Sequence, residues 1–271
     1  MVTAGDICRF LEEVAPLSLA EPWDNVGLLL GRAGREVRCV MTCLTLTAPV
    51  AAEAVRREVQ MIVTHHPVLF RGAKKITDAT AEGRIVLVLV ESGIAVYSPH
   101  TAFDSAATGV NQRLAESIGL SQIRPLRRPD QGATVGAGRC GTFPLPMAKD
   151  EFLARVSEVV GAHFLEIAWS GPETVRTVAV ACGSAADFLE DTVRAGCDVF
   201  VTGESRFHTV LESQSHGVSL VLTGHFPSER PAVIWLASLL KERFPDVQVF
   251  ASENDQNPLE LYVAEEKPVN T

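Results

Sequence analysis

Three strand-and-helix units follow one another in the second half of the chain, and this alternation restricts the fold more than any other feature. β-Branched apolar runs at 175–183, 198–203 and 218–224 predict strands, and each precedes a segment with helical spacing of its apolar residues. Successive units of this kind imply right-handed crossovers and mostly parallel strand pairing. We therefore predict an α/β protein whose ligand site lies beyond the carboxyl ends of its strands.

The first half of the chain shows the same alternation. Predicted helices at 4–17, 48–58 and 81–93 alternate with predicted strands at 36–46, 59–64 and 94–98, and a further helix is predicted at 109–120. The Gly-, Pro- and Arg-rich segment 124–146 interrupts the pattern and is interpreted as a boundary or a looped excursion. We predict two interconnected αβ lobes with mostly parallel or mixed sheets, the first formed by 1–122 and 230–271 and the second by 123–229.

Composition limits the class of protein. The 271 residues are 46% hydrophobic, enough for one large core or two modest ones. The formal net charge of -9 disfavours binding to nucleic acid, whose phosphates require a basic surface. The longest aliphatic run, IVLVLV, is too short to cross a bilayer and the N-terminus lacks the layout of a signal peptide, so we expect a cytoplasmic protein without a membrane partner.

Six cysteines without a CxxC pair indicate neither a disulfide framework nor a thiolate zinc site; reduced, mostly buried thiols are expected.

Imidazoles and carboxylates follow three of the predicted strands. His65 and His66 stand together in THHPVLF, Asp104 lies in YSPHTAFD, and His225 and Glu229 lie in TGHFPSE. An adjacent histidine pair can also place one ring in the core and the other in water, and an isolated aspartate at such a position is often a helix cap. Taken together, three nitrogens and two carboxylates suit Zn, Mn, Fe or Co better than Mg or Ca. The set predicts a site for two divalent metal ions per chain at strand ends between the lobes, with bridging carboxylates or hydroxide completing the ligands.

Other motifs and residues in the sequence are weaker indications of function. GAGRCG at 136–141 matches the GxGxxG pattern, but the two prolines of the following TFPLP argue against the helix that a dinucleotide site requires. For His163 and His216 we expect ordinary surface or packing roles. Glu204 either supports a metal ligand or begins a helix.

The motifs WDNVGLLLG, THHPVLF, YSPHTAFD, GAGRCG, DVFVTGE, TGHFPSE and NDQNPLE occur in this order. In this respect the chain resembles the Nif-three-like family, also described as GTP cyclohydrolase I type 2 homologues and dinuclear metal centre hexameric proteins. The resemblance runs from Trp23 to about Glu260 and implies a dimetal site on the same five residues and a ring-shaped hexamer. The chain is similar to the short form, because 120–175 leaves no room for an inserted domain. One departure is Thr45, where the family usually has an aspartate that could orient a metal ligand.

Two functions are compatible with these residues. The first is a metal-dependent hydrolase of the GTP cyclohydrolase type, in which a metal-bridging hydroxide attacks an electrophilic carbon of a small-molecule substrate such as a nucleotide. His100 and Glu204 are the candidate acid–base groups because both stand near strand ends. The alternative is a non-catalytic metal-binding scaffold or metal-handling ring protein. Turnover that depends on an intact metal site separates the two.

Overall fold

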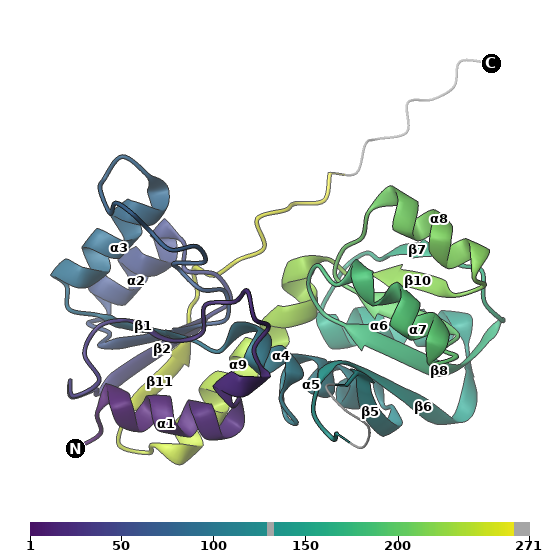
Figure 1. Ribbon diagram of the computed structural model, residues 1–271, viewed down its shortest axis with the longest axis horizontal. Coiled ribbons are helices and arrows are strands. Elements are labelled where there is room, and N and C mark those ends of the chain that lie inside the picture. The colour runs from purple at the N-terminus through teal and green to yellow at the C-terminus, as the bar shows by residue number, and fades with distance from the viewer. Residues whose placement is uncertain (129–132, 263–271) are drawn as a thin grey trace.

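The computed structural model describes residues 1–128 and 133–262, which form two α/β lobes side by side (Figure 1). Residues 129–132 of the predicted second lobe and 263–271 of the predicted first lobe lie outside the described part. The described residues form nine α-helices, two short 3-10 helices and eleven strands. The predicted α/β class with two lobes and mixed sheets is confirmed. The domain boundaries given above remain a prediction.

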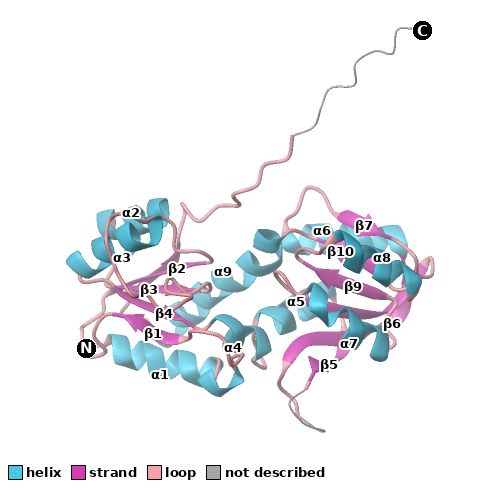
Figure 2. Ribbon diagram, turned by 45° about the horizontal axis from the view of Figure 1, so that its top comes forward, coloured by secondary structure: helices cyan, strands magenta, loops and turns pink. Residues whose placement is uncertain are grey.

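The first sheet contains five strands in the order β1-β4-β3-β2-β11. Their bounds are β1 Gly27–Leu30, β2 Cys39–Cys43, β3 Met61–Thr64, β4 Ala95–Ser98 and β11 Gln248–Ala251. All neighbouring strands pair in parallel except β1 with β4. Helices α1 (Ala4–Val14), α4 (His100–Ser105) and α9 (His225–Arg243) cover one face of this sheet, and α2 (Ala48–Arg56) and α3 (Ala81–Glu91) cover the other (Figure 2). A 3-10 turn, η1 (Leu17–Leu19), follows α1.

The second sheet contains six strands in the order β5-β6-β8-β9-β10-β7. Their bounds are β5 Ser121–Arg127, β6 Ala137–Ala148, β7 Glu166–Ala168, β8 Thr174–Ala181, β9 Val199–Thr202 and β10 Ser219–Leu222. Strands β8, β9 and β10 are parallel, as the three strand-and-helix units predict, whereas β5, β6 and β7 pair antiparallel to their neighbours. Helices α5 (Val110–Ile118) and α6 (Lys149–Val160) pack on one face, and η2 (Ala186–Phe188), α7 (Leu189–Arg194) and α8 (Phe207–Ser215) pack on the other.

The interpretation of 124–146 as a looped excursion was wrong for most of the segment, because 124–127 belong to β5 and 137–146 to β6; its interpretation as a boundary stays a prediction. Two of its prolines fall where the pairing of β6 with β8 breaks register, between Thr142 and Met147. A proline cannot donate to a strand ladder, so it is tolerated at such an irregularity. All of GAGRCG except its first residue, Gly136, lies in β6, which agrees with the argument against a dinucleotide loop.

The arginine of that motif, Arg139, is only 1% exposed and joins the two lobes. Its guanidinium donates hydrogen bonds to the side chain of Gln112 and to the carbonyl oxygens of Ser105, Ala106, Gly136 and Gly138. Ser105 ends α4 and Ala106 follows it, so the guanidinium satisfies carbonyls that the helix leaves open. A buried cation saturated in this way fixes α4 against the second sheet.

Helix α9 connects the lobes from the other side. It begins directly after β10, where Gly224 has φ +87° and Pro227 occupies the first turn, and it packs against β2 and β11 of the first sheet. Beyond β11, the carboxylate of Asp255 accepts hydrogen bonds from the backbone amide of Leu44, at 2.6 Å, and lies 3.2 Å from Nε of Arg230. Asp255 therefore ties the loop after β2 to the start of α9.

Two further expectations concern the whole chain. No helix among residues 1–128 and 133–262 is long and apolar enough to span a membrane. All six cysteines are free thiols, and five of them are buried, as expected.

Candidate metal centre

The five predicted ligands come together between the lobes, beyond the carboxyl ends of β3, β4 and β10. His65 and His66 directly follow β3, Asp104 lies on α4 just after β4, and His225 and Glu229 lie on the first turns of α9 after β10. His225 and Glu229 are four residues apart, which places them on the same face of the helix. The strand-end positions inferred from the sequence thus converge in space.

The rings of both adjacent histidines belong to this cluster of possible ligands. Their ring centroids are 5.2 Å apart. Their backbone amides donate to the carbonyl oxygens of Cys43 and Leu44 at the end of β2, which continues the pairing of β3 just past its last residue. His65 is only 3% exposed, whereas the His66 side chain reaches the pocket at 26% exposure.

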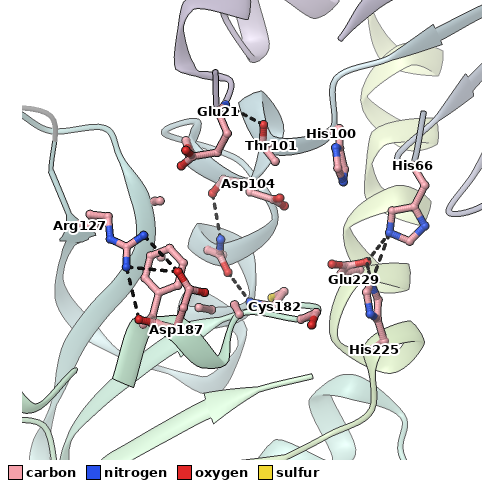
Figure 3. A pocket seen from close by; sticks show the side chains of 18 of the residues that line it. Glu21, His66, His100, Thr101, Asp104, Arg127, Cys182, Asp187, His225 and Glu229 are labelled. Carbon is pink, nitrogen blue, oxygen red and sulfur yellow. Dashed lines mark hydrogen bonds and ion pairs between the residues drawn. The ribbon is translucent and has the colours of Figure 1, made fainter. Parts of the chain in front are cut away.

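One group of ligand atoms is tightly packed. Nε2 of His66 and Nε2 of His225 each lie 3.1 Å from Oε2 of Glu229, and the two nitrogens are 3.4 Å apart (Figure 3). The hydrogen bond to Glu229 raises the pKa of His225 to about 9, although burial by itself would lower it. Burial alone would raise the pKa of Glu229, but hydrogen bonds from His225 and His66 outweigh it and hold that pKa well below its ordinary value. Three donors this close are spaced for a single divalent ion.

The second group is built from His65, Asp104 and His100. Nε2 of His65 lies 3.5 Å from Oδ1 of Asp104, yet neither atom makes a hydrogen bond, and Nδ1 of His65 is also buried without a partner. His65, His66 and His100 each offer a nitrogen within 4.8 Å of the other two. Buried polar atoms without partners are rare in proteins and cost free energy. These orphaned atoms therefore fit a site for a cation.

The electrostatics of the second group agree with that fit. Burial lowers the pKa of His65 to about 3, so its ring is neutral at pH 7, which is the form that binds metal. Burial and the nearby charge of Glu229 raise the pKa of Asp104 to about 8. In both cases burial is the largest cause and favours the neutral form of the group.

Three imidazoles of the cluster have their Nδ1 atoms held from outside. Nδ1 of His66 lies 2.8 Å from the Thr45 hydroxyl, Nδ1 of His225 lies 3.1 Å from Glu204, and Nδ1 of His100 lies 2.7 Å from a carboxylate oxygen of Asp24. Such partners fix the orientation and tautomer of a ring and leave Nε2 for the site. Thr45, at the place of the family's usual aspartate, thus contacts one of the predicted ligands, His66.

The two candidate acid–base groups occupy different places. His100 lines the pocket, whereas Glu204 is 55% exposed and lies behind His225. Burial disfavours the charged form of His100, but its hydrogen bond with Asp24 and the charges of Asp104 and Glu229 give a net rise in its pKa. Of the two roles that the sequence left open for Glu204, the structure agrees with support of a predicted ligand, because Glu204 contacts Nδ1 of His225.

Sequence reasoning missed two residues that shape the centre. Asp24 has a fully buried side chain and also accepts hydrogen bonds from the amide and hydroxyl of Thr101, which help to lower its pKa to about 2 against the effect of burial. Gly183, at the end of β8, lets Glu229 approach so closely that a Cβ atom there would lie 2.1 Å from Oε1. The only sequence signal for Asp24 was its place in the WDN motif. Gly183 had none.

Comparison with known proteins gives the context of this geometry. Residues 2–258 match the family model for Duf34/NIF3, NGG1p interacting factor 3. The chain belongs to the DUF34/NIF3 family. A relative from Clostridium perfringens called "GTP cyclohydrolase 1 type 2 homolog" is 32% identical, with 95% of this chain and 98% of the relative covered. A Streptomyces coelicolor relative of the same name is 34% identical, with 97% and 96% covered.

Solved structures agree with this membership of the DUF34/NIF3 family. A hypothetical protein from Staphylococcus aureus superposes with a TM-score of 0.87 at 26% identity, covering 96% of this chain and 99% of that one. The family predicted from the ordered motifs is therefore confirmed.

Proposed function

We propose that this protein binds two divalent transition-metal ions per chain, Zn, Fe, Mn or Co, and is a metal-dependent hydrolase. The observation that carries the proposal is the set of buried polar atoms without hydrogen-bond partners, the ring nitrogens of His65 and Oδ1 of Asp104, directly beside the packed trio of His66, His225 and Glu229. These five side chains would hold the ions. When bound, such ions act as Lewis acids and make hydroxide available near neutral pH.

His100 is proposed as the acid–base group. Its Nδ1 is held by Asp24 at 2.7 Å, so Nε2 is the nitrogen turned toward His65 and His66 and the pocket. A positioned imidazole of this kind can pass a proton to a leaving nitrogen. Glu204 would act through His225, whose orientation it fixes from behind.

The substrate proposed is a small molecule with an electrophilic ring carbon, such as a purine nucleotide. The support is the name of relatives: one from Helicobacter pylori, called "GTP cyclohydrolase 1 type 2", is 28% identical and matches 96% of this chain and all of its own length. The pocket of about 570 Å³ beside the ligands has the size of a small-molecule site.

The test combines metal analysis with turnover. Protein purified without added metal should contain close to two ions per chain, and His65→Ala should lose them together with any turnover while circular dichroism stays unchanged. His163→Ala, a substitution of an exposed histidine away from the pocket, is the matched control and should change neither. Two ions without turnover of any nucleotide or phosphoester would favour the scaffold alternative, and absence of metal would refute both.

Assembly is proposed to be a closed homo-oligomer, a hexamer, on the basis of the family resemblance. Light scattering at micromolar concentration is the measurement, and a monomer would remove the idea. The formal net charge of -9 continues to disfavour nucleic acid as a partner.

A further inference from the structure

The pocket beside the metal centre is built by both lobes and has two distinct ends. Figure 3 shows His66, His225 and Glu229 on one side and Arg127 with Asp187 on the other. Its volume of about 570 Å³ is that of a small-molecule site. The lining between the two ends can therefore contact a ligand beside the metal-ligand cluster.

Two exposed aromatic rings line this pocket next to the imidazoles. Trp23 is 58% exposed and Phe70 is 45% exposed, and their ring centroids lie 5.7 Å apart. Each centroid is also 6.2 Å from that of His100, which in turn lies 5.3 Å from that of His65. Large aromatic faces left open to solvent at a pocket are a surface on which a flat ring can stack.

Away from the ligand cluster, the charged lining of the pocket does not favour a chain of phosphates. Among the described residues that line it, Arg127 is the only lysine or arginine. Its guanidinium donates to one oxygen of Asp191 at 2.8 and 3.0 Å and to Asp187 at 3.3 Å, and it lies 4.0 Å from the ring centre of Phe188. Because two carboxylates already neutralise this cation, no lysine or arginine among the described lining residues is free to bind a polyphosphate.

We propose that Trp23 and Phe70 form a stacking site for the flat face of an uncharged nitrogen heterocycle, such as a purine nucleoside, and that the pocket has no separate polyphosphate site. A ring on these faces would lie beside His100 and the ligand cluster. The inference rests on the proposed hydrolase function in one respect, since the stacked ring would be the group that is hydrolysed. The proposal therefore makes the heterocyclic ring, and not the phosphates of a nucleotide, the part of the substrate that the pocket recognises.

Equilibrium dialysis of the full-length protein as purified tests this, with guanosine, adenosine and pterin as probes. At least one probe should bind, and Trp23→Ala and Phe70→Ala should each weaken it on the order of 10-fold, the usual scale for loss of one stacking partner. Trp23→Phe, which keeps a flat ring, should weaken binding less than Trp23→Ala. The matched control is Phe164→Ala, an exposed aromatic outside the pocket at 51% exposure, which should bind as the parent does.

The phosphate part of the inference is tested by comparing guanosine with GTP at equal metal content. GTP should bind no more tightly than guanosine. GTP binding more than 10-fold tighter, no binding of any of the three rings, or equal affinities in Trp23→Ala and the parent would each overturn the proposal. Ring binding lost in Trp23→Ala but without turnover would instead support the stacking site and refute only the hydrolase. Turnover of a non-aromatic substrate without ring binding would do the reverse.

Discussion

The substitution Gly183→Ala tests whether close backbone approach at the end of β8 shapes the metal centre. Gly183 has φ +69°, and a Cβ atom there would lie 2.1 Å from Oε1 of Glu229 and 3.3 Å from Nε2 of His225. Contact at 2.1 Å is impossible, so the end of the Glu229 side chain would have to move. That movement would separate the carboxylate from His66 and His225, which it now meets at 3.1 Å.

Gly183→Ala should have two separate effects, one on the stability of the fold and one on metal binding. An alanine held in the left-handed region costs about 1–2 kcal/mol of folding free energy. This corresponds to a fall in Tm of roughly 2–8 °C for a chain of this size. Displacement of Glu229 should in addition weaken metal binding by roughly 10–100-fold, the range found when the support of a metal ligand is disturbed.

The matched control is Gly196→Ala. Gly196 has φ +70°, nearly the same as Gly183, but no atom lies within 4 Å of its added Cβ. Both variants should lose similar stability in thermal unfolding, whereas only Gly183→Ala should lose metal in competition with a chromophoric chelator. Unchanged metal affinity in Gly183→Ala, or an equal loss in Gly196→Ala, would refute the reasoning.

Three further predictions concern protons and buried carboxylates. The pKa values of about 9 for His225 and about 8 for Asp104 lie above the usual values, so both groups hold protons at pH 7 that an ion must displace. Metal affinity should therefore rise from pH 7 to 9, and calorimetry in buffers of different ionisation enthalpy should detect proton release; its absence would contradict the shifts. Buried Glu53 accepts hydrogen bonds from Ser252 and Asn254, which with other bonds lower its pKa against the effect of burial. Glu53→Gln should lose about 2 kcal/mol in urea unfolding at pH 7, and the difference from the parent should shrink as acid protonates the carboxylate below pH 4, whereas a constant difference would argue against it. Asp24→Asn should keep metal content but lower turnover on the order of 10-fold, since His100 loses its carboxylate partner; unchanged turnover would remove Asp24 from the mechanism.

The sequence by itself determined the α/β alternation and the set of candidate ligands. Period-two and helical patterns are local, and the carboxyl ends of parallel strands meet at one edge, so residues placed just after strands 59–64, 94–98 and 218–224 could be expected to converge. Two local features needed no knowledge of distant contacts: the adjacency of His65 and His66, and the four-residue spacing of His225 and Glu229. The structure agrees with this convergence.

Only the tertiary structure decided the residues that support the site. Residues 124–127 and 137–146 of the proline- and glycine-rich segment form strands because β5 pairs with β6, and β6 pairs with β8 across a register break, which no local pattern records. Asp24 reaches His100 across 76 positions, and Gly183 meets Glu229 only because α9 returns between the lobes. Such contacts depend on how distant elements pack, and the free energy of that packing cannot be predicted from residues that are neighbours in the sequence.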